Sequence, residues 1–178
     1  MRRLAMVLAA GLCALPLQAQ QVRDPGVPLV PQGDFDRESL LGSWFEVAQT
    51  PTLLERDCHG TTATVETRED SRFTLRIACQ VGRLGGPVLP IEGVLVETAP
   101  GVFQVRLNRL PQMGNLVLVV AWLSPGADVL ALAAPRGEIG WIWARDAVPD
   151  AGMLDEARAA LVGQGYRASA IRPVPQVP

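Results

Sequence analysis

Between residues 43 and 145 the chain alternates short apolar segments with turn residues. Segments of this length, rich in Val, Leu, Ile and Trp and separated by about a dozen positions, predict β-strands joined by short connections. Breaks such as Gly85-Gly86-Pro87 and Ser124-Pro125-Gly126 mark the connections. We expect eight strands, at Ser43–Thr50, Thr61–Thr67, Arg72–Gln80, Ile91–Glu97, Val102–Leu110, Leu116–Leu123, Asp128–Ala133 and Ile139–Arg145.

The predicted strands differ in how apolar residues are distributed over their two faces. In the third and fifth strands apolar and polar residues alternate, which is typical of a sheet with one face in solvent. The sixth, seventh and eighth strands are apolar almost throughout, so a further element must cover their outer face. We expect the helix described next to be that element.

One segment of the chain predicts an α-helix. Asp150 is suited to the N-cap position, and Gly163 and Gly165 end the segment. Its apolar stripe is formed by Met153, Leu154, Ala157, Ala160 and Leu161. A short closing strand is expected at Tyr166–Ile171. The pattern therefore predicts an all-β fold, an eight-stranded antiparallel up-and-down barrel with one C-terminal α-helix packed outside.

The first 19 residues predict a secretory signal peptide. Met1-Arg2-Arg3 supplies a positive start, Leu4–Leu17 an apolar stretch, and Ala19 a small residue for cleavage. We expect export across the inner membrane to the periplasm. Cys13 lacks the preceding Leu and small residue that lipid anchoring requires, so no lipid anchor is expected. The remaining chain divides into a Pro-rich leader or tether at 20–34, the barrel domain at 35–172 and a Pro-rich tail at 173–178.

Composition excludes several classes of protein. Hydrophobic residues make up 48% of the chain and charged residues 19%, which excludes a disordered chain. Without Arg2 and Arg3, 14 basic residues remain against 18 acidic ones, which excludes a nucleic-acid binder that relies on phosphate attraction. His59 is the single histidine, so neither a metal site nor a Ser–His–Asp triad is expected, and the prediction includes no cofactor.

Two cysteines, Cys58 and Cys79, remain after signal cleavage. In an oxidising compartment they permit one intramolecular disulfide, while two buried free thiols are the alternative.

An eight-stranded barrel has an interior that is either filled by side chains or holds one small ligand. Small inward candidates beside a few large ones leave room for an apolar ligand. Glu46 either points inward, where Arg76 or Arg106 could meet it, or points outward. The Trp122, Trp141 and Trp143 cluster either fills the core or stacks on a ligand. The full set of cavity candidates is Glu46, Ala48, Phe73, Leu75, Ile77, Gly93, Phe103, Val105, Leu107, Val120, Trp122, Trp141 and Trp143.

The segment from Leu41 to Ala48, preceded by Phe35-Asp36, resembles the Gly-x-Trp signature of the lipocalins, in the form found in bacterial outer-membrane lipocalins and apolipoprotein D. The segment Cys58–Thr64, the second cysteine Cys79, the segment Trp141–Arg145 and the closing Gly165-Tyr166 follow in the family's order and spacing. The resemblance covers about residues 35 to 171, nearly the whole chain after the signal.

The resemblance implies a role for each matching residue. Trp44 would lie at the closed floor of the barrel with Arg145 across its ring, and Gly42 would let the leading turn approach that floor. Cys58 and Cys79 would form a disulfide between the first open-end loop and the third strand. The chain departs from the family at Leu123–Ala127, where an Asp-x-x-Tyr-like connection is usual, and in lacking the lipidation cysteine.

Three functions are compatible with these features. The resemblance implies binding and transport or storage of a fatty acid, lysophospholipid or similar lipid in the cell envelope, with peripheral association at the outer membrane as one arrangement. An interaction module, such as a barrel-type protease inhibitor with a filled interior, is the alternative. A lipid-modifying enzyme on the same scaffold is a third, and we expect no enzyme. A monomer and a dimer are both compatible with the sequence.

Overall fold

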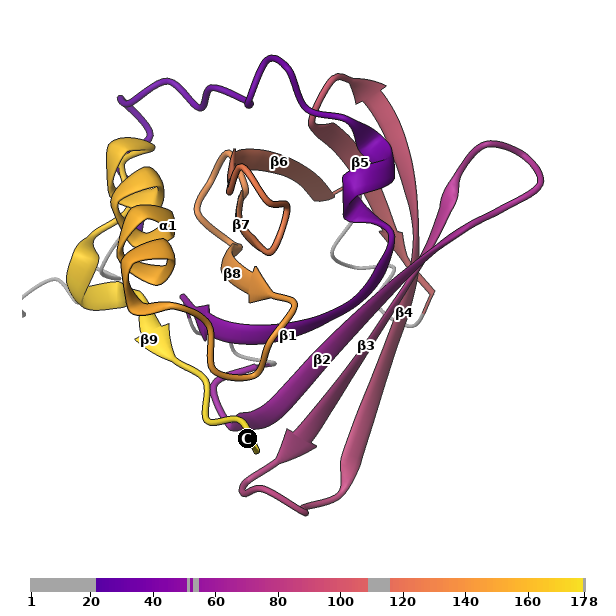
Figure 1. Cartoon of the computed structure of the whole chain (residues 1–178), viewed down its shortest axis with the longest axis vertical. Coiled ribbons are helices and arrows are strands. Elements are labelled where there is room, and N and C mark those ends of the chain that lie inside the picture. Colours follow the sequence, from indigo (N-terminus) through magenta and orange to yellow (C-terminus); the bar gives the residue numbers. More distant parts are fainter. Residues whose placement is uncertain (1–21, 51, 53–54, 109–115, 178) are drawn as a thin grey trace, which may run out of the picture.

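The computed structural model describes residues 22–50, 52, 55–108 and 116–177. The predicted signal peptide and the predicted end of the fifth strand at Leu110 lie outside these residues. Nine strands form a single antiparallel sheet that closes on itself through the pairing of β1 with β2 (Figure 1). The strands are β1 (Gly42–Gln49), β2 (Cys58–Thr67), β3 (Phe73–Val81), β4 (Val88–Ala99), β5 (Val102–Leu107), β6 (Leu116–Leu123), β7 (Val129–Ala133), β8 (Gly140–Ala144) and β9 (Arg172–Pro173).

The first eight strands form the predicted up-and-down barrel, because each pairs with the next in sequence and β8 returns to β1. The β3–β4 and β7–β8 connections and the described part of the β1–β2 connection lie at one end, which we call the open end. The β2–β3, β4–β5 and β6–β7 turns and the 3₁₀ helix η1 (Arg37–Leu40) lie at the other, the closed end. The barrel prediction is confirmed.

A single α-helix, α1 (Ala151–Gly163), packs on the outside of the barrel in the described part of the chain (Figure 1). The Asp150 carboxylate accepts a hydrogen bond from the Met153 backbone N–H at 3.0 Å, as an N-cap residue does. Ala157 and Leu161 of the predicted stripe are completely buried against β6, β7 and β8. The helix therefore covers the outer face of the strands that are apolar on both sides.

The barrel has two apolar cores, one inside it and one beneath the helix. The inner core contains Trp44, Phe73, Phe103 and Trp143, among others. The outer core lies between α1 and the sheet, and includes Val129, Ala131, Ile142 and Leu161 among its members.

Two β-bulges shift the alternation of inward and outward residues. In β1 the register with β8 slips between Glu46 and Ala48, and in β6 the register with β7 slips between Val120 and Trp122. Ala48 therefore pairs with outward-facing Ile142, and Trp122 with outward-facing Ala131. Both residues belong to the outer core, which corrects their assignment to the cavity.

The described part of the Pro-rich leader is attached to the barrel by hydrogen bonds. Gln32 donates its backbone N–H to Val120 O at 2.9 Å and accepts one from Leu123 through its side chain at 2.6 Å. The Arg23 guanidinium is buried and donates to Pro135 O and Val27 O. The described leader thus lies along the barrel wall between α1 and η1 (Figure 1).

The chain after the helix also differs from the expected closing strand at Tyr166–Ile171. A 3₁₀ turn, η3 (Ala168–Ala170), occupies half of that segment, and the closing strand is β9, which pairs with β1. The Tyr166 hydroxyl accepts from Ala134 N at 2.9 Å, so this side chain attaches the segment to the β7–β8 turn instead. Beyond β9 the Gln176 side chain donates to Glu46 O at 2.7 Å and Thr61 O at 3.1 Å, and so bridges β1 and β2.

Candidate functional site

The closed end of the barrel is a floor made by Trp44 and Arg145. The Arg145 guanidinium lies 3.5 Å from the centre of the Trp44 ring, which is a cation–π contact. It donates hydrogen bonds to the backbone oxygens of Ser43, Leu41 and Ser39 at 2.8 to 3.0 Å. Gly42, with a φ of 93°, allows the chain to pass close to this guanidinium. The contact expected from the resemblance is present, and it is structural.

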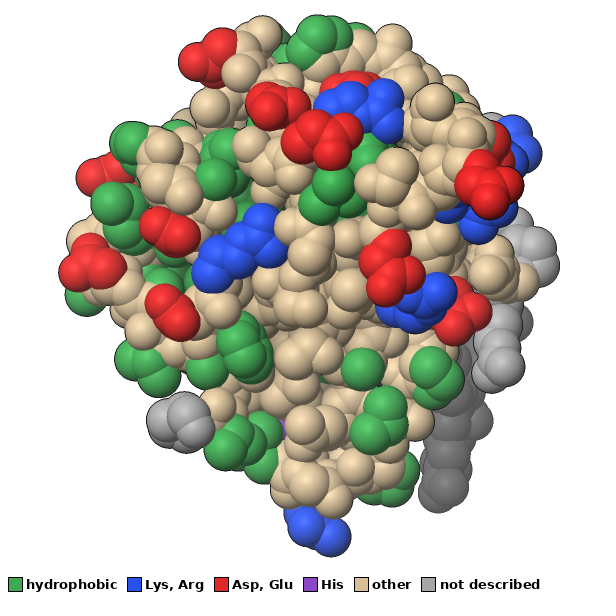
Figure 2. All heavy atoms as spheres, turned by 45° about the vertical axis from the view of Figure 1, so that its right-hand side comes forward, with side chains coloured by type: hydrophobic (Ala, Val, Ile, Leu, Met, Phe, Trp, Pro, Cys, Tyr) green, Lys and Arg blue, Asp and Glu red, His purple; other side chains and the backbone are tan. Residues whose placement is uncertain are grey.

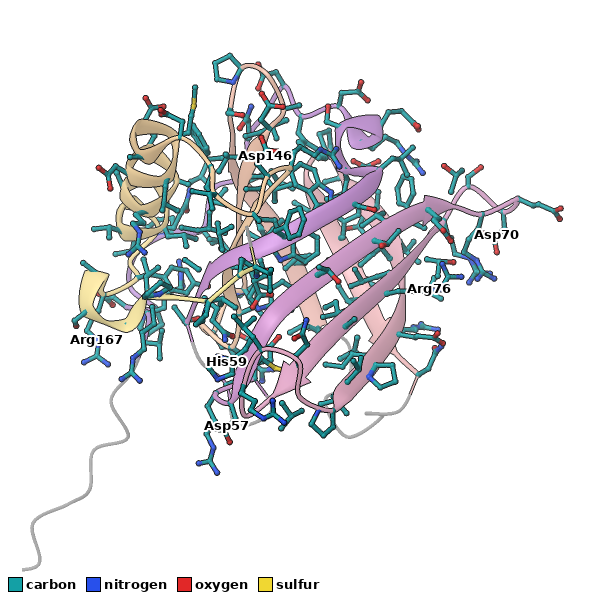
Figure 3. All side chains as sticks on the ribbon, turned by 60° about the horizontal axis from the view of Figure 1, so that its bottom comes forward. Asp57, His59, Asp70, Arg76, Asp146 and Arg167 are labelled. Atoms are coloured by element: carbon teal, nitrogen blue, oxygen red, sulfur yellow. A yellow bond between two sulfur atoms is a disulfide. The ribbon has the colours of Figure 1, made fainter. Side chains whose placement is uncertain are left out.

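The open end carries the disulfide. Cys58 at the start of β2 and Cys79 near the end of β3 are bonded, which confirms the expected pair. Asp57 and His59 flank Cys58 at this end of the barrel (Figure 3). The described residues contain no group of three or more side chains suited to hold a metal ion. None of the described helices is long and apolar enough to cross a membrane.

A small cavity opens into the barrel interior from the open end. Water-sized groups fit in about 30 Å³ of this space, and about 470 Å³ is free of atoms when narrow gaps and open solvent are counted as well. The first volume holds only one or two water-sized groups, so side chains nearly fill the interior. The described lining is apolar apart from three residues at one side, and consists of Leu75, Ile77, Ile91, Val105, Leu107, Leu116, Ile139 and Trp141 together with Thr52, Glu55 and Glu138.

Five of the predicted cavity residues line this space, namely Leu75, Ile77, Val105, Leu107 and Trp141. Four others, Phe73, Phe103, Val120 and Trp143, are buried in the inner core without lining it. Gly93 is buried opposite Leu75 and Leu107, where an added Cβ would lie 2.8 Å from Arg106 O.

Glu46 points inward and is completely buried, and neither expected arginine partner reaches it. Arg76 lies on the outer face and pairs with Glu66 and Glu92 (Figure 3). Arg106 is an exposed outward residue of β5.

Sequence reasoning missed Glu55, Thr52, Ile91, Leu116, Ile139 and Glu138 as lining residues. Glu55 and Thr52 belong to the connection between β1 and β2, where no alternation indicates a side-chain direction. Ile91, Leu116 and Ile139 could have been found, because they lie in or next to predicted strands and on the same face as residues that were chosen.

Glu46 and Glu55 form a pair of buried carboxyl groups beside the cavity. Burial raises the pKa of Glu46 well above its ordinary value, and the neighbouring Glu55 raises it further. The Trp143 N–H donates to Glu46 Oε2 at 3.4 Å and partly opposes this rise in pKa. Burial also raises the pKa of Glu55, against the hydrogen bond from the Thr52 hydroxyl at 3.0 Å. Both carboxyl groups therefore hold their protons more tightly than surface glutamates do.

Two indoles lie next to these carboxyls. Trp141 and Trp143 of β8 stack with ring centres 5.5 Å apart and planes 16° from parallel. Gln49 pairs with Trp141 across the β1–β8 ladder and donates its side-chain N–H to Glu55 O at 3.0 Å. The Trp141 N–H lies near Glu55 and opposes the rise in the pKa of Glu55, but it forms no hydrogen bond of normal geometry within the described residues. One side of the interior is thus polar and acidic.

Known proteins share this architecture. The model of the lipocalin-like domain family matches residues 35–176. Lobster apocrustacyanin A1 is 14% identical over 85% of this chain and 91% of its own, with a TM-score of 0.65. The allergen Per a 4 from cockroaches is 12% identical over 86% of this chain and 97% of its own, with a TM-score of 0.66. No curated protein sequence is similar enough to be matched. Because the family match spans most of the chain, this protein belongs to the lipocalin-like family.

Proposed function

We propose that the protein binds a small lipid inside its barrel and carries or stores it in the cell envelope. The observation that carries the proposal is the apolar-lined cavity reached from the open end of the barrel. Members of the family are generally binding and transport proteins, which supports the same function. Burial of a methylene group contributes about 0.8 kcal/mol, so ten buried methylenes supply about 8 kcal/mol before ordering costs. A dissociation constant in the micromolar range or weaker follows once the ordering costs are subtracted.

Occupation by a lipid requires the interior to widen. Ligand pockets usually enclose about 300 Å³ or more. The volume available inside this barrel, about 30 Å³, is far smaller than such a pocket. Leu107 and Ile91 are only partly buried, so they are the lining side chains with the most freedom to move outward. We infer that the ligand displaces such side chains near the mouth and leaves the packed floor unchanged.

The envelope location rests on the predicted signal peptide and on the disulfide, which needs an oxidising compartment to persist. The open end also carries apolar residues in and beside the β3–β4 connection, which are 36 to 60% exposed, namely Val81, Leu84, Val88 and Leu89. In Figure 2 apolar side chains gather toward the bottom of the molecule, where this connection lies. Such a surface favours contact with a membrane while the ligand is exchanged. Fractionation of cells that express the full chain tests the location.

Native mass spectrometry of the purified protein, followed by organic extraction, tests ligand binding. We expect a co-purified lipid and a change in tryptophan fluorescence when a fatty acid or fatty alcohol is titrated. Leu107→Phe fills part of the cavity with a larger side chain and is expected to weaken binding about tenfold, since overpacking costs more than about 1 kcal/mol. Gln104→Phe, on the outward face of the same strand, is the matched control and should bind as the unaltered protein does.

The nearly filled interior favours a second candidate function, that of a protein-interaction module such as a barrel-type protease inhibitor. In that case the outer surface would perform the function, and the interior would serve stability alone. Protein without extracted lipid and without a fluorescence response would support this candidate and refute the carrier.

A further inference from the structure

Of the six buried side-chain polar atoms that have no hydrogen-bond partner among the described residues, three belong to the β1–β8 wall of the barrel. They are Glu46 Oε1, Gln49 Oε1 and Trp141 Nε1, and each belongs to a side chain that is at least 95% buried. Burial of a polar atom without a partner is unfavourable, and native interiors contain few such atoms. Three such atoms on one wall of a barrel indicate that a polar group of a ligand supplies the missing hydrogen bonds.

The strand register brings these atoms together. Across the β1–β8 ladder Glu46 pairs with Trp143 and Gln49 pairs with Trp141. The bulge between Glu46 and Ala48 directs the Gln49 side chain inward. Glu55 lies against the same wall, because its backbone oxygen accepts from the Gln49 side chain and its carboxyl raises the pKa of Glu46. Glu55 and Trp141 both line the cavity, so the polar wall faces the ligand space.

The ionisable groups of this wall are all acidic. Glu55 and Glu138 line the cavity and Glu46 lies behind them, while the described lining includes no Arg, Lys or His. Arg136 pairs with Glu138 at the rim at 3.1 Å, but its side chain is 81% exposed. An anionic headgroup would therefore meet carboxyl groups and no counter-ion inside the barrel. A cationic headgroup would meet the Glu55 carboxyl, whose ionised form it would stabilise.

We propose that the Glu55–Trp141 wall, with Glu46 behind it, is a headgroup site for the primary ammonium group of an amphiphile. The inference rests on the proposed function, because it names the ligand class of the same cavity. Ionised Glu55 accepts hydrogen bonds from the ammonium and from the Trp141 N–H, which then gains its missing partner. The Trp141 ring adds a face of the type that binds cations best.

The size of the cavity selects among cationic groups. The about 30 Å³ present beside Glu55 and Trp141 holds a water-sized group, which a primary ammonium is. A bulky quaternary ammonium or phosphate would need further opening of the polar wall. The alkyl chain would occupy the space that opens between the apolar lining side chains on the other walls.

Isothermal titration calorimetry with three probes of equal chain length tests the headgroup. Octylamine is protonated at pH 7 as a lysine side chain is, 1-octanol is neutral and octanoate is anionic. We expect octylammonium to bind at least about tenfold more tightly than octanol, because a charge-assisted hydrogen bond exceeds a neutral one by that factor or more. Octanoate is expected to bind most weakly of the three.

Two glutamate variants separate headgroup recognition from folding. Glu55→Gln should bring the affinities for octylammonium and octanol to within about threefold of each other while octanol binding is retained. Glu92→Gln removes an exposed carboxylate on the outer face of β4 and should leave the ratio unchanged. If Glu55→Gln does not fold, the three-probe comparison on the unaltered protein still tests whether the cavity prefers an ammonium headgroup.

The outcomes distinguish this inference from the proposed function. Equal binding of octanol and octylammonium, or tighter binding of octanoate, would overturn the ammonium site and leave a carrier of neutral or anionic lipids. Binding of none of the three probes would overturn both. Retention of the full ammonium preference in Glu55→Gln would show that the wall plays no part in recognition.

Discussion

Glu46 is a carboxyl group that the fold buries completely and gives a single weak hydrogen bond within the described residues. Burial there, together with the nearby Glu55, raises its pKa above the ordinary 4.5. The folded protein therefore holds the Glu46 proton more tightly than the unfolded chain does. The contribution of Glu46 to the free energy of unfolding is complete below pH 4.5 and is lost as the pH rises toward the folded-state pKa.

We expect Glu46→Gln to reduce the loss of stability as the pH rises above 4.5, because a glutamine side chain has no proton to lose there. Urea unfolding of both proteins at several pH values measures the effect. Glu92→Gln, on the outer face, should keep the pH dependence of the unaltered protein. Parallel stability profiles for Glu46→Gln and the unaltered protein would contradict the buried position of this carboxyl.

Arg145 combines a stacking contact with three hydrogen bonds to backbone oxygens. A lysine keeps the charge but has neither the planar surface nor the forked donors. Arg145→Lys is therefore expected to lower the free energy of unfolding by about 2 kcal/mol. Thermal unfolding measures the change, and Arg167→Lys at an exposed position supplies the control. A loss as small as that of the control would show that the floor does not depend on the guanidinium.

At the scale of the element, α1 is held by residues that the sequence pattern identified. Leu161 is completely buried in the outer core, whereas its neighbour Val162 is 43% exposed. Leu161→Ala should lower the free energy of unfolding by about 2 to 5 kcal/mol, since it leaves a cavity beneath the helix. Val162→Ala should change it by less than about 1 kcal/mol. Similar losses in the two variants, measured by urea unfolding, would contradict the packing.

Most strands could be predicted because their alternation and turn residues are local properties of the sequence. The direction of individual side chains was harder to predict, as Ala48 and Trp122 illustrate. Each lies just after a β-bulge, and one extra residue reverses every later inward and outward assignment. A bulge arises from pairing with a distant strand, so the sequence of β1 or β6 alone does not contain it.

The polar part of the candidate site was predicted only in part. Glu46 could be identified as an inward candidate because it alternates with Trp44 in a clear strand. Glu55 could not, because it enters the interior from a connection and its position depends on bonds to Gln49 and Thr52. The proline content of the leader and tail likewise did not indicate the hydrogen bonds that attach them to the barrel.

At the scale of the whole molecule, the disulfide joins two neighbouring strands at the open end. It closes a loop with a sequence separation of 21 residues, for which the chain-entropy estimate is about 3 kcal/mol. We expect the Cys58→Ser/Cys79→Ser variant to lose about that much stability. The unaltered protein should lose a similar amount in a reductant, while the double variant should not respond to it. A reductant effect of equal size in both proteins would contradict the bond.

Closure of the barrel depends on the pairing of β1 with β8, two strands separated by about 90 residues of sequence. During synthesis, the edge of β1 that pairs with β8 therefore stays unpaired until residue 144 has emerged from the ribosome. Throughout that interval the growing meander exposes apolar surface that the finished barrel conceals. Production of this protein should accordingly benefit from slow translation or from a chaperone that holds the nascent chain, and rapid overexpression should yield inclusion bodies.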